Sequence, residues 1–183
     1  MTGPIPGGRR RIDRVLADDF LTDLESADLD RLRELRHEAD QEDADLSYIR
    51  RMLQGRIDIV DAELRRRAPG GDAVSLVDQL AQILADDSRT TRGTGRHLSV
   101  EPSRVAEHRR DVERIVADAV LSDVGARSED ELADALERLR AYEREVSEAR
   151  RRVQAVADQL TAELGRRYRD GVVDPSNVLP SDA

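Results

Sequence analysis

The chain repeats itself at a spacing of 100 residues. When residues 11–67 are laid against residues 111–167, 17 of the 57 positions are identical. An internal duplication of this length restricts the fold, because both copies must form the same local structure and bury equivalent surfaces. We therefore expect a pseudo-symmetric protein built from two related halves.

Each copy contains a long stretch with the pattern of a helix. From about Asp28 to Arg67 the sequence has no Pro, and a second stretch begins at a predicted capping box, Ser128 with Glu131, and ends near Gly171. Apolar residues recur every three or four positions in both stretches, which predicts a narrow coiled-coil seam. The seam residues are Leu46, Ile49, Leu53, Ile57, Val60 and Leu64 in the first copy and Val146, Ala149, Val153, Ala157, Leu160 and Leu164 in the second.

The composition agrees with this fold class. Hydrophobic and charged residues each make up 38% of the chain and aromatic residues only 2%, so a thick core is not expected. We predict an all-α fold, a long antiparallel coiled-coil hairpin from an internal duplication, with short flanking helices (12–24 and 112–124) and a mobile linker. The predicted organisation is a flexible tail (1–10), a single helical coiled-coil domain (11–171) and a flexible C-terminal tail (172–183). Within the domain we place repeat 1 at 11–67, a short helix at 73–84, a linker at 86–103 and repeat 2 at 111–167.

Five polar residues keep helical spacing in both copies, at intervals of four, three, four and four residues. They are Asp43, Ser47, Arg50, Gln54 and Asp58 in the first copy and Glu143, Ser147, Arg150, Gln154 and Asp158 in the second. On an α-helix this spacing gives one stripe, about 80° wide and about 22 Å long. If the two helices pair antiparallel, the pseudo-two-fold axis stands perpendicular to their plane and both stripes share one face. The pattern therefore predicts a composite site.

The residue types suit a guanine nucleotide. A carboxylate can accept hydrogen bonds from guanine N1 and N2, while Arg can pair with its O6 and N7 edge, stack on its ring or hold a phosphate. The sequence has no GxxxxGK[ST] phosphate-binding loop. A single stripe of this kind is usually the solvated flank of a coiled coil, but its repetition in both copies favours a binding site.

At these residues the sequence resembles the RsiG anti-sigma factors of Streptomyces and related actinobacteria. That family carries the pattern E-x3-S-x2-R-x3-Q-x3-D on each of two antiparallel helices. The second copy matches it at five positions and the first at four, with Asp43 in place of Glu. The resemblance implies that the ten motif residues bind cyclic di-GMP, and that the loaded protein sequesters a sporulation sigma factor of the WhiG type and inhibits its transcription.

Other functions find less support in the sequence. Asp58 and Asp158 lack the nucleophile or metal-binding neighbours of an acid–base catalyst, and His37, His97 and His108 are scattered, so we expect neither an enzyme nor a metal site. The net charge of −9 argues against direct DNA binding. The absence of Cys and of long apolar runs predicts a soluble cytoplasmic protein without membrane contact.

Two alternatives remain open at this point. The helical hairpin could be a protein-interaction scaffold that binds no nucleotide. It could also be a cyclic-dinucleotide effector whose protein partner is not a sigma factor. A series of nucleotides tested for thermal stabilisation separates the first alternative from the others.

Overall fold

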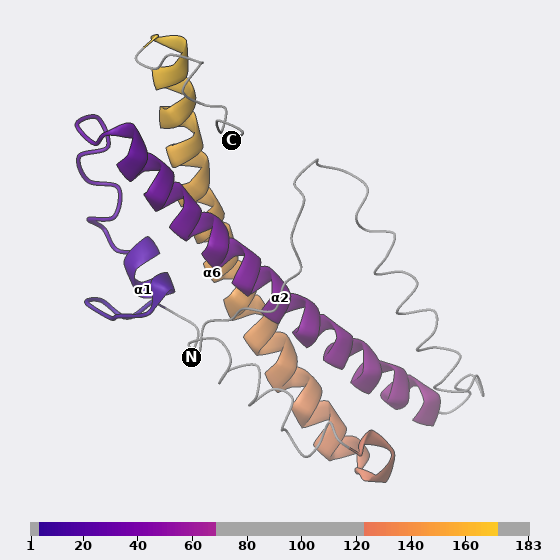
Figure 1. Cartoon of the computed structure of the whole chain (residues 1–183). Coiled ribbons are helices and arrows are strands. Elements are labelled where there is room, and N and C mark those ends of the chain that lie inside the picture. Colours follow the sequence, from indigo (N-terminus) through magenta and orange to yellow (C-terminus); the bar gives the residue numbers. More distant parts are fainter. Residues whose placement is uncertain (1–3, 69–122, 172–183) are drawn as a thin grey trace, which may run out of the picture. The chain divides into compact units, whose positions relative to one another are not determined.

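The computed structural model describes residues 4–68 and 123–171. These residues form α1 (Arg11–Val15), α2 (Leu29–Arg67), the 3₁₀ helix η1 (Val124–Ala126) and α6 (Glu129–Arg169), and the described ranges contain no β-strand. The two long helices α2 and α6 pack against each other (Figure 1). The prediction of an all-α fold with two long paired helices is thus confirmed.

The chain divides into two compact units, and each long helix contributes to both. Among the described residues, unit 1 holds 4–43 and 149–171, and unit 2 holds 44–68 and 123–148. Unit 1 therefore contains α1, the first part of α2 and the last part of α6. Unit 2 contains the last part of α2, η1 and the first part of α6.

Both long helices begin at side-chain caps in equivalent positions of the two copies. The Asp28 carboxylate accepts a hydrogen bond of 2.7 Å from the Arg31 amide at the start of α2. At the start of α6 the predicted capping box is present, because the Glu131 amide donates to the Ser128 hydroxyl at 3.3 Å and the Ser128 amide donates to the Glu131 carboxylate at 2.9 Å. These bonds satisfy amide groups that have no partner within the helix.

The apolar seam is buried in both units. The buried hydrophobic residues of unit 1 are Ile12, Val15, Leu32, Leu35, Ala39, Ala149, Val153, Ala157, Leu160 and Leu164. Those of unit 2 are Leu46, Ile49, Leu53, Val60, Ala62, Val124, Leu132, Ala135, Leu136, Leu139 and Val146. Ile57 and Leu64, which we also assigned to the seam, are half-buried. The seam supplies five of the ten buried hydrophobic residues of unit 1 and five of the eleven of unit 2.

The predicted flanking helix at 12–24 is shorter than expected. It is helical only as α1, and residues 17–26 form successive turns, including hydrogen bonds from the Phe20 amide to the Ala17 carbonyl and from the Thr22 amide to the Asp19 carbonyl, both 3.1 Å. Asp18 and Asp19 follow α1 after two intervening residues, Leu16 and Ala17. Carboxylates at a helix C-terminus oppose the helix dipole, and Asp has a low helix propensity, so the chain leaves the helix there.

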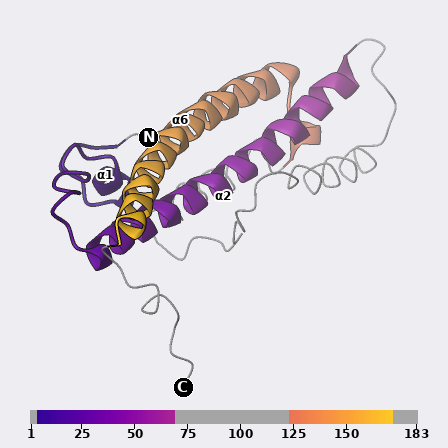
Figure 2. The same cartoon turned by 90° about the horizontal axis from the view of Figure 1, so that it is seen from above.

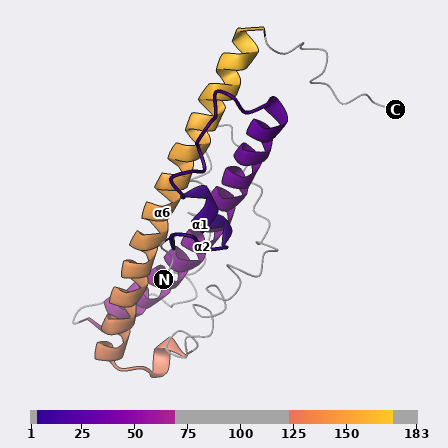
Figure 3. The same cartoon turned by 90° about the vertical axis from the view of Figure 1, so that its left-hand side faces the viewer.

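The segment before α1 is held to that helix in unit 1. The buried Asp13 carboxylate accepts hydrogen bonds from the Ile5 amide at 2.8 Å and from the Arg10 amide and Nε at 3.1 and 3.0 Å. The hydrogen bond from the Arg10 side chain is the main reason why the pKa of Asp13 is lowered. Figures 2 and 3 show the chain running from α1 to the start of α2.

Several predicted segments lie outside the described residues. They are the short helix at 73–84, the linker at 86–103, most of the second flanking helix at 112–124, the first three residues and the C-terminal tail at 172–183. At the end of the second flanking segment the structure begins again at Asp123 and enters η1.

Candidate functional site

All ten motif residues lie in the two long helices. Asp43, Ser47, Arg50, Gln54 and Asp58 are in α2, and Glu143, Ser147, Arg150, Gln154 and Asp158 are in α6. The last Asp of each motif is exposed and the other eight residues are less exposed, beside the seam. The two motifs therefore have similar burial patterns, within reach of solvent.

In unit 2 an ion pair joins the two motifs. Arg50 Nη1 lies 4.0 Å from Glu143 Oε1, and the two side chains are 36% and 20% exposed. The Ser147 hydroxyl donates a hydrogen bond of 2.8 Å to the same Glu143 oxygen. The third position of the first motif thus meets the first position of the second motif.

In unit 1 the equivalent residues form the reciprocal ion pair. Arg150 Nε lies 3.0 Å from Asp43 Oδ1, and the two side chains are 23% and 14% exposed. The pair is closer and more buried than the pair in unit 2, although Asp43 has one methylene fewer than Glu143. The shorter acid has not prevented the contact.

The reciprocal pairs show that α2 and α6 are antiparallel within each unit. In unit 1, Arg33 donates to the Tyr168 hydroxyl at 3.0 Å, and Asp43, further along α2, meets the earlier α6 residue Arg150. In unit 2, Arg50 meets Glu143 and the later residue Asp61 meets the earlier residue Arg140 at 3.2 Å. The predicted antiparallel pairing is confirmed.

The chemistry of the paired positions is that of a charged donor beside a charged acceptor. A guanidinium and a carboxylate that lie side by side can also bind one ligand together. The guanidinium donates to an acceptor edge of the ligand, and the carboxylate accepts from its donor groups. The remaining motif residues follow on the same helices without entering these two ion pairs. They are Ser47, Gln54, Asp58 and Ser147 in unit 2 and Gln154 and Asp158 in unit 1.

Unit 2 contains a second constellation, which the sequence analysis did not single out. At the last turn of α2, the Arg67 guanidinium donates hydrogen bonds to the main-chain carbonyls of Val124, Gly125 and Arg127, at 3.0, 3.1 and 2.5 Å. Arg67 Nε also donates to Glu63 at 2.6 Å. The arginine therefore clamps the segment that leads into α6.

Unit 1 contains the equivalent clamp, 100 residues away in the sequence. The Arg167 guanidinium donates to the carbonyls of Leu24, Glu25 and Ala27, at 2.6, 3.0 and 2.5 Å. Its Nε donates to Glu163 at 2.9 Å. The last turn of each long helix is thus bonded to the segment that precedes the other, and we call Arg67 and Arg167 the clamp arginines.

The glutamate of each clamp is held ionised. Hydrogen bonds from Arg66 and then Arg67 lower the pKa of Glu63 to about 2. Those from Arg166 and then Arg167 likewise lower the pKa of Glu163 to about 2. A carboxylate with such a pKa stays negative at neutral pH, so it orients the clamp guanidinium throughout the physiological range.

A signal for the clamps was present in the sequence. The segments ELRRR (63–67) and ELGRR (163–167) agree at four of five positions, which places them among the most similar parts of the two copies. The motif stripe was found by its polar spacing, whereas Glu63 and Arg67 resemble ordinary charged residues at a helix end. Only the fold shows what they bind.

Two other site classes can be compared with the described part of the chain. No group of three or more His, Cys, Asp or Glu in residues 4–68 and 123–171 could hold a metal ion. Within these ranges, none of the helices has the length and hydrophobicity of a membrane-spanning segment.

These features define a duplicated helical protein in which two copies of one polar motif are brought together by antiparallel pairing. The model of the RsiG-like family matches residues 18–84 and 118–180, so the chain belongs to the RsiG-like family. The two matched regions begin 100 residues apart, in agreement with the internal duplication. No curated protein matches the sequence.

Membership of this family indicates the role of an anti-sigma factor. The partner indicated by that role is a sigma factor.

Proposed function

We propose that the chain is an anti-sigma factor that binds cyclic di-GMP on its two motifs and, when loaded, sequesters a sporulation sigma factor of the WhiG type. The observation that carries the proposal is the reciprocal contact of Arg50 with Glu143 and of Arg150 with Asp43. Each contact places one guanidinium and one carboxylate from different motifs side by side. A guanine presents an O6 and N7 acceptor edge and N1 and N2 donors, which these two groups complement.

The proposed partner fits the charge of the chain. The net charge is −9, and sigma factors present basic surfaces to DNA, so an acidic chain can occupy surfaces that DNA would otherwise meet. In this proposal a fall in cyclic di-GMP releases the sigma factor, which then directs transcription of developmental genes. The protein works in the cytoplasm, without contacting DNA or a membrane and without catalysing a reaction.

Isothermal titration with cyclic di-GMP tests the ligand. We expect the unmodified protein to bind, and Arg50→Ala and Arg150→Ala each to lose most of the affinity, because an arginine that contacts base or phosphate contributes on the order of 1–3 kcal/mol. Arg65→Ala is a matched control, because Arg65 is 69% exposed and pairs with Asp61 on its own helix. Unchanged binding in both motif variants would remove the motif from the site.

Capture of a purified WhiG-type sigma factor tests the partner. We expect capture by the immobilised protein with cyclic di-GMP and little capture without it. Equal capture in both conditions would show that the ligand does not control the interaction.

A thermal-shift series with cyclic di-GMP, cyclic di-AMP and GTP separates the proposal from its alternatives. A rise in melting temperature with cyclic di-GMP alone supports the proposed ligand. No rise with any nucleotide would favour the interaction scaffold. A rise with cyclic di-GMP together with failure to capture the sigma factor would favour an effector with a different partner.

A further inference from the structure

The clamp arginines and the motif ion pairs keep the same sequence separation in both units. On α2 of unit 2, Arg50 precedes the clamp arginine Arg67, and on α6 of unit 1, Arg150 precedes Arg167 by the same number of positions. The acidic residue of each ion pair follows the last residue whose carbonyl is clamped, and the number of positions between the two residues is the same in both units. These carbonyl and acid pairs are Arg127 with Glu143 in unit 2 and Ala27 with Asp43 in unit 1. The duplication has therefore kept the distance from clamp to motif on both helices.

The apolar seam alone does not define the axial register of the two helices. Its side chains are similar to one another, because they are all Leu, Ile or Val except Ala149 and Ala157, and the buried core beside it adds Ala39 and Ala135. Seams of small, interchangeable residues are compatible with more than one register, and coiled coils usually fix register with polar or charged contacts. A slip of one helical turn moves a residue about 5.4 Å along the partner, which is enough to separate either motif ion pair.

The clamps supply directed contacts that fix the axial position of one helix against the other, which the apolar seam alone does not do. Each guanidinium donates to three carbonyls at once, which requires one position of the helix end relative to the partner's entry segment. Arg67 and Arg167 are only 17% and 11% exposed, and their Nε groups donate to Glu63 and Glu163. A planar fork with several directed donors is specific to Arg, and a Lys ammonium cannot reproduce it.

We propose that Arg67 and Arg167 are positioning residues of the motif: each fixes the register of α2 against α6 in its own unit and so sets the contact of Arg50 with Glu143 or of Arg150 with Asp43. The effect on nucleotide binding rests on the proposed function, whereas the effect on register does not. Neither clamp arginine touches the nucleotide in this proposal.

The first test measures cyclic di-GMP affinity in Arg67→Lys and Arg167→Lys. Lys keeps the charge and the ion pair with Glu63 or Glu163, so the variants are expected to fold, with unchanged helical content by circular dichroism. We expect affinity to fall by about tenfold in each, because molecules in a slipped register lack the motif contact, and a binding-competent fraction of about one tenth lowers the apparent affinity by that factor. The matched control is Arg65→Lys, close to a clamp arginine in the sequence and expected to stay within about twofold.

The second test reads the register without any ligand. The chain has no Cys, so spin labels can be attached at Arg56→Cys in α2 and Glu137→Cys in α6, both in unit 2 and outside the motif. In the doubly labelled protein we expect one narrow distance distribution. Adding Arg67→Lys should broaden or shift it by about one helical turn, and adding Arg65→Lys should not.

The outcomes separate the two proposals. If the unmodified protein does not bind cyclic di-GMP, the proposed function fails while the label distances still decide the register. Label distances that do not respond to Arg67→Lys would overturn the positioning role, whatever happens to affinity. A shifted distance with unchanged affinity would also overturn it, because the motif would then not depend on the register.

Discussion

Each unit has a motif ion pair and a clamp, but the two units differ in the helix surface that lies between the ion pair and the clamp. In unit 2 the intervening surface is bridged, because Asp61 pairs with Arg140 across the helices at 3.2 Å and with Arg65 on its own helix at 2.7 Å. In unit 1 the equivalents of these three residues are Thr161, Asp40 and Gly165. They line a hollow of about 500 Å³ whose other walls include Arg33 and Tyr168.

The units also differ at one buried position. Glu42 of unit 1 is fully buried and lies 3.9 Å from Arg11, which comes from α1. The equivalent residue in unit 2 is the half-buried Tyr142. In unit 1 the contact with α1 is reinforced by the ion pair of Arg14 with Glu38.

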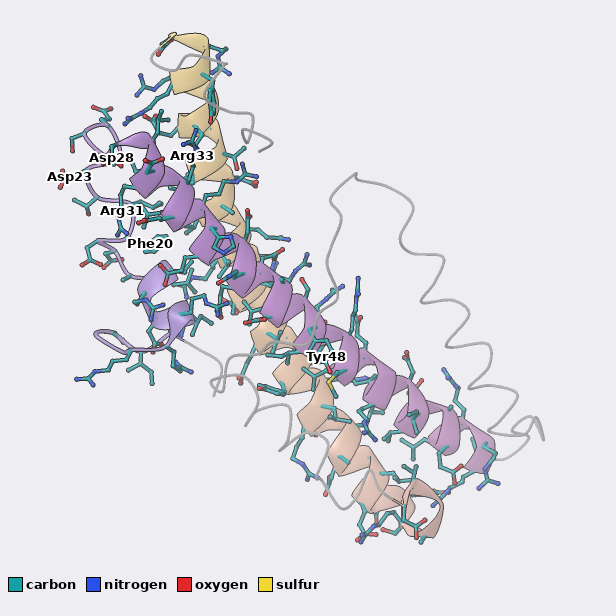
Figure 4. All side chains as sticks on the ribbon, in the orientation of Figure 1. Phe20, Asp23, Asp28, Arg31, Arg33 and Tyr48 are labelled. Atoms are coloured by element: carbon teal, nitrogen blue, oxygen red, sulfur yellow. The ribbon has the colours of Figure 1, made fainter. Side chains whose placement is uncertain are left out.

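Unit 1 has a second hollow, next to α1, of about 580 Å³. Its lining includes Phe20, Asp23 and Arg31, which are labelled in Figure 4 together with Asp28 and Tyr48. The two units thus keep the contacts that align the helices and differ in the surfaces around them. This division indicates which contacts were constrained after duplication.

The largest expected effect concerns the seam. Leu53 of unit 2 and its equivalent Val153 of unit 1 are both fully buried. We expect Leu53→Ala to lower the free energy of unfolding by about 3 kcal/mol and Val153→Ala by about 2 kcal/mol, because the first removes one more carbon from a packed site. Urea unfolding followed by circular dichroism measures both. A larger loss in Val153→Ala would show that the seam of unit 1 packs more tightly.

The helix caps should give the next largest effect. Asp28→Ala should cost about 1 kcal/mol and Ser128→Ala somewhat less, because the bond at Asp28 is shorter and its acceptor carries a charge that also favours the helix N-terminus. The same unfolding experiment applies. Asp28→Asn serves as the control, since it keeps an acceptor and should recover most of the loss. A larger cost in Ser128→Ala would mean that its reciprocal bond to Glu131 dominates.

A smaller effect is expected when the two motifs are made alike. Asp43→Glu gives both copies the same five residues, and titration with cyclic di-GMP should show less than about a threefold change in affinity, because the acid keeps its charge and Arg150 can adjust to one further methylene. Asp43→Ala should weaken binding far more. If Asp43→Glu were as damaging as Asp43→Ala, the reach of the shorter acid would be a requirement of the site.

The smallest effect concerns the bridge of unit 2. Arg140 is 51% exposed, so Arg140→Gln should change the free energy of unfolding by less than about 0.5 kcal/mol. The reverse exchange in unit 1, Asp40→Arg with Thr161→Asp, should add a similarly small amount. A larger change in either protein would mean that the bridge contributes to helix pairing beyond an exposed ion pair.

Much of the fold could be predicted because it depends on local pattern. The predicted helix from about Asp28 to Arg67 agrees with α2, and the predicted second helix, ending near Gly171, agrees with α6, which ends at Arg169 before a positive φ of 70° at that glycine. The flanking helix was overestimated, because its apolar spacing continues through Asp18 and Asp19, which have a low helix propensity and whose carboxylates oppose the helix dipole near the C-terminus of α1.

The site was predictable in its positions but not in its contacts. Duplicated spacing located Arg50 and Arg150 on the helices, and symmetry showed that both stripes share one face if the helices pair antiparallel. The partners Glu143 and Asp43 depend on the axial register, which a seam of similar apolar side chains does not specify. The clamps were missed for a related reason, since their acceptors are main-chain carbonyls and leave no residue signature.

That use of the main chain has an evolutionary consequence. The clamped segments carry Leu24, Glu25 and Ala27 in one unit and Val124, Gly125 and Arg127 in the other, with no identity at these three positions. Since every residue type has a carbonyl, substitutions in these segments leave the acceptors in place. The entry segments can therefore accumulate mutations and acquire new surface chemistry while a single arginine preserves the alignment of the helices.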